Sequence, residues 1–232
     1  MSCDVPGPTG APVVERILGI DEAGRGSVLG PLVVGGFLID RARAEQLTTI
    51  GAKDSKALSP ARRERVYEDL PSLGQCEAVV LSPREIDRYV VRRRLNELEA
   101  RAFGALVSRL RPDEAHVDAC DVDARRFARE VARWSRAPVR IVSRHHADRD
   151  DVVVGAASIV AKVRRDRALA RLARAVGHDL GSGYPSDPRT IEFLRNYLAT
   201  KTRVPTWVRA SWATMQRVKL TRPARTLDGF SS

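Results

Sequence analysis

The sequence predicts an α/β fold in which helices cover both faces of a β-sheet and a small helical region is appended at the C-terminal end. Short apolar runs typical of buried strands alternate along the chain with longer segments of helical period. One run, Leu32–Ile39, is apolar throughout, as expected for a strand covered on both faces. The 232 residues are 43% hydrophobic, which is enough for one substantial core.

Residues 1–14 are rich in Pro and Gly and are expected to form a disordered tail.

Five segments after this tail are predicted to be strands. The first strand, Arg16–Ile20, follows this tail and ends at Asp21-Glu22, and a glycine-rich turn then leads to Leu32–Ile39. The remaining predicted strands are Cys76–Leu81, Ala115–Val117 and Val139–Val142.

Helical segments fill the intervals between these strands. One helix is predicted to begin at Ser59-Pro60, because serine is a good N-cap and proline is tolerated in the first turn. An apolar stripe from Leu95 to Leu110, stopped by Pro112, predicts another. The other predicted helices are Asp123–Trp134, Asp151–Val176 with Gly177 at its C-terminal end, and Pro188–Leu198.

We expect a domain boundary near Gly183, between a main domain over 15–183 and a C-terminal helical region over 184–232. The C-terminal region contains too few residues for a core of its own. It is therefore expected to pack against the main domain.

The charge balance favours a polyanionic partner. Lys and Arg total 40 against 29 acidic residues, which gives a formal net charge of +11. Such a field attracts nucleic acid. An arginine-rich composition inherited from a GC-rich genome would produce the same balance, so charge alone leaves both explanations open.

Membrane insertion and secretion are not indicated. No run approaches the roughly 18 apolar residues of a membrane span, and the first residues lack the basic and apolar regions of a signal peptide. The three cysteines contain no CxxC pair, so neither a disulfide framework nor a cysteine zinc site is predicted. These features predict a cytoplasmic protein.

Acidic residues follow three of the predicted strands. Asp21 and Glu22 close the first, Asp118 closes Ala115–Val117, and Asp148 follows Val139–Val142. Because active sites of α/β sheets gather where strand ends and loops converge, these acids are expected to share one pocket. Clustered carboxylates repel one another unless a proton or cation neutralises them, and Mg²⁺ and Mn²⁺ prefer oxygen ligands. Such ions can assist phosphodiester hydrolysis.

Ordinary structural roles compete with this reading. Asp118 or Asp121 could cap the helix that begins near Asp123, and Asp148, Asp150 and Asp151 could be loop or capping acids. Neighbouring residues of a strand also face opposite sides. Asp21 and Glu22 can therefore share a pocket only if the strand ends or bends there.

The turn Gly24-Arg25-Gly26, followed by Gly30-Pro31, lets the backbone come close to a ligand. Its spacing is near that of a dinucleotide-binding loop. Such a loop leads directly into a helix, whereas Pro31 and a strand-like run follow here. Two acids just before the glycines would also repel a pyrophosphate, so a nicotinamide enzyme is disfavoured.

Seven sequence blocks together resemble ribonuclease HII of the archaeal type. They cover most of the chain, from Arg16 to Thr214, and occur in the family's order. The blocks are Ile20–Gly26 continuing to Leu32, Lys53–Lys56, Leu95–Glu99, Val117–Val122, His145–Asp148 continuing to Asp166, Gly181–Pro185 and Ser211–Thr214.

This resemblance implies the ribonuclease H-like fold, a mixed five-stranded sheet flanked by helices. It implies Asp21, Glu22, Asp118 and Asp148 as catalytic and metal-binding residues, with Mg²⁺ or Mn²⁺ as cofactor. The implied substrates are RNA/DNA hybrids and duplex DNA with embedded ribonucleotides, which are cut on the 5′ side to leave 3′-hydroxyl and 5′-phosphate ends. The implied processes are ribonucleotide excision and RNA primer removal.

The resemblance also implies substrate-binding residues. Backbone groups of Gly24, Arg25 and Gly26 would read the ribose 2′-hydroxyl, which distinguishes RNA from DNA. Tyr184 would pack on the sugar of the following deoxynucleotide, and the implied phosphate contacts are Ser55, Lys56 and Lys162. Without the resemblance, Tyr184 would be taken as a turn aromatic, and Lys162 and Arg165 as the solvated face of a helix.

One departure from the family concerns His146, which stands where lysine is usual. This substitution would make a substrate contact depend on pH.

Two alternative functions remain at this point. The chain could be another nuclease of the same superfamily, such as ribonuclease HIII or a DNA resolvase, or a non-catalytic nucleic-acid-binding protein. Arg25 between two glycines and the short N-terminal segment argue against ribonuclease HIII. Retention of all four acids argues against a pure binder, because negative charge would face phosphates. The archaeal-type blocks suggest a monomer.

Overall fold

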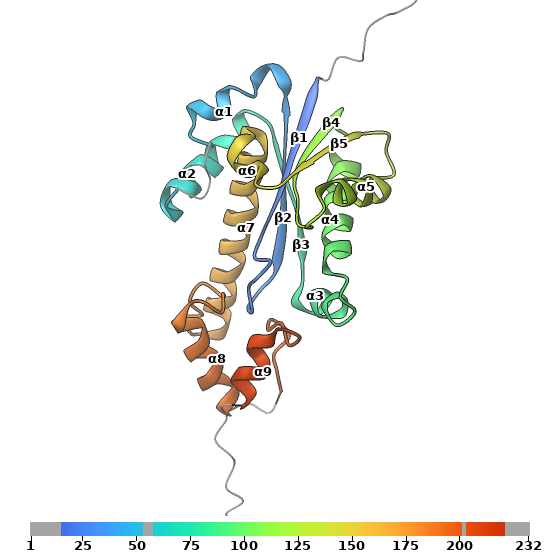
Figure 1. Cartoon of the computed structure of the whole chain (residues 1–232). Coiled ribbons are helices and arrows are strands. Elements are labelled where there is room, and N and C mark those ends of the chain that lie inside the picture. Colours follow the sequence, from blue (N-terminus) through green and yellow to red (C-terminus); the bar gives the residue numbers. More distant parts are fainter. Residues whose placement is uncertain (1–14, 53–57, 201–202, 221–232) are drawn as a thin grey trace, which may run out of the picture.

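A computed structural model describes residues 15–52, 58–200 and 203–220 of the chain. It contains a mixed five-stranded sheet in the order β3-β2-β1-β4-β5, which confirms the sheet expected above (Figure 1). β1 pairs with β4, and β4 with β5, in parallel; β2 is antiparallel to both β1 and β3. The strands are β1 (Arg16–Ala23), β2 (Leu32–Asp40), β3 (Gln75–Leu81), β4 (Glu114–Asp118) and β5 (Arg140–Arg144).

Helices connect these strands and continue beyond the last one. The helix predicted to begin at Ser59-Pro60 and the helices predicted over 95–110, 123–134, 151–176 and 188–198 are all present. Short segments that the sequence did not indicate add α1, α3, α6 and α9 and two 3₁₀ turns. The helices are α1 (Gln46–Thr49), α2 (Pro60–Asp69), α3 (Pro83–Val90), α4 (Leu95–Leu110), α5 (Ala124–Ser135), α6 (Ala147–Asp150), α7 (Val152–Val176), α8 (Pro188–Thr200) and α9 (Ala213–Leu220).

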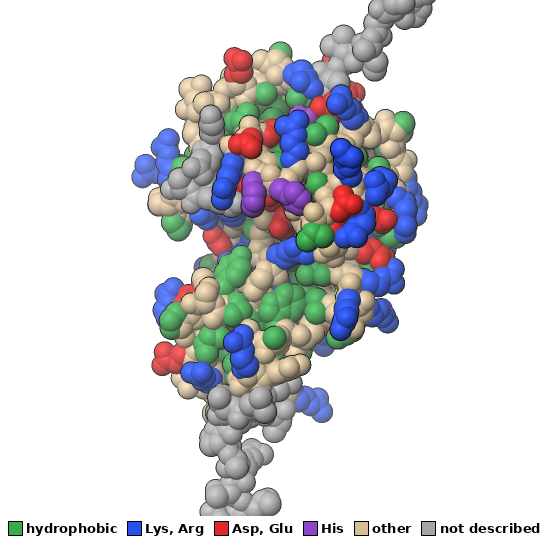
Figure 2. All heavy atoms as spheres, in the orientation of Figure 1, with side chains coloured by type: hydrophobic (Ala, Val, Ile, Leu, Met, Phe, Trp, Pro, Cys, Tyr) green, Lys and Arg blue, Asp and Glu red, His purple; other side chains and the backbone are tan. Residues whose placement is uncertain are grey.

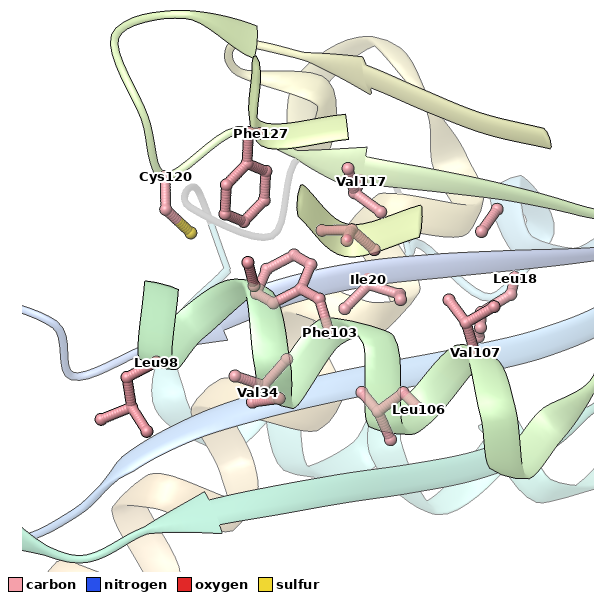
Figure 3. Close-up of a cluster of buried hydrophobic side chains, with 14 of the residues drawn as sticks. Leu18, Ile20, Val34, Leu98, Phe103, Leu106, Val107, Val117, Cys120 and Phe127 are labelled. Atoms are coloured by element: carbon pink, nitrogen blue, oxygen red, sulfur yellow. The ribbon is translucent and has the colours of Figure 1, made fainter. Parts of the chain in front are cut away.

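The sheet has a hydrophobic core on each face. On one face α4 and α5 pack against β1, β2 and β4, and Phe103 and Phe127 meet edge to face with ring centroids 5.1 Å apart (Figure 3). On the other face α7 and α2 form a second core around Phe37 and Ile159. The two layers are visible on either side of the strands in Figure 1. The continuous apolar character of Leu32–Ile39 follows from this double coverage.

Glycines let α7 lie unusually close to the sheet. A Cβ atom on Gly35 of β2 would stand 2.5 Å from the carbonyl oxygen of Ala157, and one on Gly19 of β1 would stand 2.2 Å from that of Val153. Both obstacles are helix backbone, which cannot turn aside as a side chain can. This contact fixes the position of α7, which carries several residues of the site described below.

The C-terminal helices pack against the main domain through a third core. Leu194, Leu198 and Met215 meet Val28 and Leu29, which belong to the loop between β1 and β2. An isolated β-bridge also joins Leu29 to Val208. Figure 2 shows a waist between the sheet and these helices, with Lys and Arg side chains along the rims of this face. The boundary near Gly183 stays a prediction.

One sequence expectation needs adjustment, and another is not tested. The first strand does not stop at Ile20 but continues through Asp21 and Glu22 to Ala23, because β2 goes on pairing with it as far as Val33. The predicted tail over 1–14 lies outside the described residues. No described helix is long and apolar enough to span a bilayer.

The close packing of α7 generates a stability prediction. We expect Gly35→Ala to lower the free energy of unfolding by about 3 kcal/mol, because the added methyl overlaps helix backbone. The neighbouring Gly36→Ala is the matched control, since its methyl would meet only leucine side-chain ends at 3.2 Å or more. It should cost less than about 1 kcal/mol. Urea unfolding measures both, and equal losses would contradict this account of α7.

Candidate active site

The parallel pairing of β1, β4 and β5 brings the predicted acids to one edge of the sheet. Ile20 and Val117 are the last paired residues of β1 and β4. Asp21 and Asp118 are the next residues on these neighbouring strands. β5 ends beside Asp118 at Arg144, and the chain then enters α6, which carries Asp148. The carboxyl ends of β1 and β4, together with α6 directly after β5, thus supply all four acids.

Asp21 and Glu22 are adjacent on β1 and nevertheless interact. The Asp21 carboxylate accepts a hydrogen bond from the Glu22 amide at 2.7 Å and also contacts Ser158 of α7. The Glu22 carboxylate accepts from the Cys120 thiol at 3.3 Å and from the Asp21 carboxyl. β4 no longer pairs with β1 beyond Ile20, so this stretch is free on one side. The strand does not end at these acids, since β1 continues to pair with β2 as far as Ala23.

Asp118 and Asp148 are connected through the start of α6. The amide of Ala147 donates to Asp118 Oδ1 at 3.1 Å, and the neighbouring Asp148 is 2% exposed. Neither acid caps a long helix. That role belongs to Asp123 for α5 and to Asp151 for α7, whose side chains accept from the first-turn amides.

Burial and mutual repulsion make this cluster unfavourable when it is fully ionised. Burial, and then the charges of Glu22 and Asp118, raise the pKa of Asp21 well above its ordinary value. Burial, and then the charge of Glu99, likewise raise the pKa of Glu22. Hydrogen bonds from Ser158 and Cys120 oppose these shifts only in part. The cluster therefore favours protons or a cation.

The donor chemistry fits a hard divalent cation, because the acids offer only carboxylate oxygens. Among the described residues, no three acidic, histidine or cysteine side chains already surround one point as ligands. Repulsion favours such separation, and Asp118 and Glu22 are turned toward Ala147 and Cys120 by their own hydrogen bonds. By contrast, Asp121 is committed to an ion pair with Arg126.

The glycine turn follows directly after these acids. Gly24 has a φ of 90°, a conformation that residues with side chains rarely adopt, and the side chain of its neighbour Arg25 is partly exposed. Arg25 lies 3.0 Å from the Glu99 carboxylate and donates to Asn96 Oδ1 and the Cys120 carbonyl. Its side chain therefore braces the turn against α4. Because the Arg25 side chain makes these protein contacts, the predicted contact of Arg25 with substrate would be made by its backbone.

Glu99 is a residue that the sequence reasoning missed as part of the site. It is fully buried, and burial raises its pKa to about 7 despite the opposing charges of Arg25 and Arg209. A signal was available, because Glu99 lies on the apolar stripe of α4, four residues after Leu95. An acid on a buried helix face requires a cationic partner.

The other predicted substrate residues fall into three groups. Tyr184 borders the turn: a Cβ on Gly26 would be 3.9 Å from its ring, and the Arg165 guanidinium lies 4.7 Å from the ring centre. Lys162 is one turn after Ser158 and shares its face of α7. Ser55 and Lys56 lie outside the described residues.

Two further residues differ from the simplest expectation. Arg165 is 4% exposed and bonds Ser27 Oγ and the Ser182 carbonyl, so it does not belong to the solvated face of α7. His146 is exposed and has a φ of 58°, in the left-handed region where histidine is enriched among non-glycine residues. A role for His146 in substrate contact stays a prediction.

Comparisons with known proteins agree with the architecture. A family model described as ribonuclease HII matches residues 18–215. The ribonuclease HII of Methanothrix thermoacetophila is 45% identical over 205 residues, which cover 88% of this chain and 97% of that protein.

Solved structures give the same result. The ribonuclease H2 of Pyrococcus horikoshii superimposes with a TM-score of 0.80 at 39% identity, covering 88% of this chain and 97% of that one. The ribonuclease HII of Archaeoglobus fulgidus, solved in complex with PCNA, gives 0.78 at 40% identity, covering 84% and 94%. The sheet order, the matched residues and these similarities together show that the chain belongs to the ribonuclease HII family.

Proposed function

We propose that this ribonuclease H, beyond cutting the RNA strand of RNA/DNA hybrids, cuts on the 5′ side of single ribonucleotides embedded in duplex DNA. The products would be 3′-hydroxyl and 5′-phosphate ends. The observation that carries the proposal is the position of the glycine turn. It follows Asp21 and Glu22 directly in the chain, so a ribose at the turn would present its phosphodiester to the acids.

Asp21, Glu22, Asp118 and Asp148 would hold Mg²⁺ or Mn²⁺. The bound cation supplies a more acidic water and neutralises negative charge that develops on phosphate oxygens. The chain's own residues orient the carboxylates. Ser158 and the Glu22 amide hold Asp21, the Cys120 thiol holds Glu22, and the Ala147 amide holds Asp118. Such supporting contacts tune the affinity and geometry of a metal site.

Substrate selection would come from the other side of the site. Gly26 is exposed beside the Tyr184 ring, so an amide donor and an aromatic face border the same space. A 2′-hydroxyl can accept from the amide, and the ring can pack on a deoxyribose that lacks this hydroxyl. Lys162 would add a phosphate contact from α7. A pure binder is disfavoured, because the buried acids weaken both the fold and the attraction of phosphates.

Ribonucleotide excision and RNA primer removal are the processes that such cleavage would serve. A sliding clamp is proposed as a further partner, because the Archaeoglobus relative was solved in complex with PCNA. Gel filtration of the full chain with the clamp of its own organism tests this association and also gives the oligomeric state of the free chain, for which a monomer is proposed.

The first prediction concerns a labelled DNA duplex with one ribonucleotide. The native chain with Mg²⁺ or Mn²⁺ should cut on the 5′ side of that ribonucleotide. Asp118→Asn should lower the rate by more than about 100-fold, because even groups that only support metal ligands are worth about 10- to 100-fold. Asp121→Asn is the matched control, since Asp121 is paired with Arg126 and should keep most of the activity.

Gel analysis of the products also separates the alternatives. Cleavage of long hybrids without cleavage at the single ribonucleotide would contradict the junction role of Gly26 and Tyr184. If neither substrate is cut with either metal, the proposed catalytic residues are wrong.

A second prediction concerns stability without metal. The raised pKa of Asp21 means that the folded chain holds a proton which the unfolded chain releases above pH about 4. The contribution of Asp21 to stability is therefore greatest below that pH and is lost as pH rises through the folded-state pKa. We expect Asp21→Asn to be more thermostable than the native chain in EDTA, by a margin that widens from pH 5 to pH 8.

Calorimetry with and without the metal completes this test. Mg²⁺ or Mn²⁺ should raise the Tm of the native chain, because a ligand that binds only the folded state stabilises it. The same ions should raise the Tm of Asp21→Asn much less. A variant that is less stable than the native chain at pH 8 in EDTA would contradict the repulsion described for this cluster.

A further inference from the structure

Arg209 is a buried arginine at the junction between the C-terminal region and the glycine turn. Arg209 is 0% exposed, and charged side chains are rarely buried to this extent unless they have partners. Nη1 donates to the carbonyl of Arg25 at 2.9 Å, and Nε donates to the carbonyl of Gly30 at 3.2 Å. Its own amide donates to the carbonyl of Val28 at 2.9 Å. One residue therefore holds both ends and the middle of the loop between β1 and β2.

The bond to Arg25 also determines where the next amide points. A trans peptide is planar, so the carbonyl of Arg25 and the N–H of Gly26 point in opposite directions. Because Arg209 holds that carbonyl from the buried side, the Gly26 N–H is directed outward. Gly26 is exposed, and among the described residues its N–H donates to no protein acceptor.

Trp212 secures the peptide on the other side of Gly26. Its indole Nε1 donates to the Gly26 carbonyl at 3.3 Å, and its ring lies under the Arg209 guanidinium, 4.9 Å from ring centre to Cζ. The carbonyls before and after the Gly26 N–H are thus both tied to the segment 209–212. Burial, and then the charge of Arg165, lower the pKa of Arg209 to about 10, and the nearby charges of Tyr184, Asp87 and Glu99 oppose this shift only in part.

We propose that Arg209 is a positioning residue for ribose recognition, which aims the Gly26 amide at the 2′-hydroxyl by holding the carbonyls of Arg25 and Gly30. The inference rests on the proposed junction function, in which this turn reads the ribose. A site built to hydrogen-bond a hydroxyl discriminates strongly against the analogue that lacks it, provided that the donor is fixed in place. Loss of Arg209 should therefore lower discrimination between ribose and deoxyribose.

The arginine fork explains why lysine is not an equivalent here. Two separate nitrogens of a planar guanidinium reach two carbonyls at once, whereas an ammonium group is a single point donor on a flexible stem. Arg209→Lys keeps the charge and can hold only one carbonyl well. Arg209→Met keeps much of the volume and holds neither, so its effect on discrimination should be larger.

Binding to uncleaved duplexes tests the proposal directly. Each variant is combined with Asp118→Asn, and the Kd for a duplex with one ribonucleotide is compared with that for the all-DNA duplex by fluorescence anisotropy. Arg209→Lys should reduce this preference by about two- to tenfold, the equivalent of one weakened hydrogen bond. Its affinity for all-DNA duplex should stay within about twofold, because no phosphate contact is removed.

Two variants control for general effects on the fold. Arg164→Lys alters another arginine that bonds a backbone carbonyl, that of Cys76 in β3 rather than one in the loop between β1 and β2, and it should leave the preference unchanged. Trp212→Phe keeps a ring beneath Arg209 and removes the bond to the Gly26 carbonyl. It should reduce the preference in the same direction, and it carries the test if the Arg209 variants do not fold.

The outcomes separate this inference from the function on which it rests. Reduced preference with retained all-DNA affinity supports the positioning role. Equal weakening for both duplexes, or a lower Tm with unchanged preference, would show that Arg209 is merely structural. If Asp118→Asn alone binds both duplexes equally, the proposed reading of the ribose fails, and the inference fails with it.

Discussion

The repulsion among buried carboxylates at one edge of the sheet is the constraint on which the rest of the structure depends. Parallel pairing of β1, β4 and β5 forces Asp21 and Asp118 to be neighbours, and the chain after β5 brings Asp148 to the same edge. Without a proton or cation to neutralise it, such a cluster lowers the stability of the fold. The two cores on either face of the sheet, and the close contact of α7 with Gly19 and Gly35, offset that loss.

Two buried arginines hold the loop between β1 and β2, which contains the glycine turn. Arg165 on α7 and Arg209 near the C-terminal end both reach the loop between β1 and β2, one through Ser27 and the other through backbone carbonyls. They lie close enough that the charge of Arg165 contributes to lowering the pKa of Arg209 to about 10, after the larger effect of burial. The sheet and α6 thus supply the acids, while the C-terminal region holds the glycine turn that follows Asp21 and Glu22.

Much of this arrangement could be predicted from the sequence, and the remainder could not for physical reasons. Periodicity located all five strands, and acids after apolar runs located the carboxylate edge. β1 ends at Ala23, three residues beyond the predicted apolar run and one beyond the acids expected to close it, since pairing with β2 continues through these polar positions. Short helices such as α6 have too few residues for a periodic pattern. Arg209 gave no local signal, because its partners are about 180 residues away in sequence.

That distance has a consequence for biosynthesis. The β-bridge between Leu29 and Val208 and the bonds from Arg209 to the carbonyls of Arg25 and Gly30 join residues 25–30, near the start of the chain, to residues 208–209, near its end. Contacts of such long range close late, because the intervening chain must be ordered first. The strands and their acids can assemble while the C-terminal region is still being translated, but the turn acquires its final shape only afterwards. A nascent chain therefore forms its acidic edge before the glycine turn is fixed, and the order of synthesis delays completion of this edge of the molecule until the C-terminal region has been made.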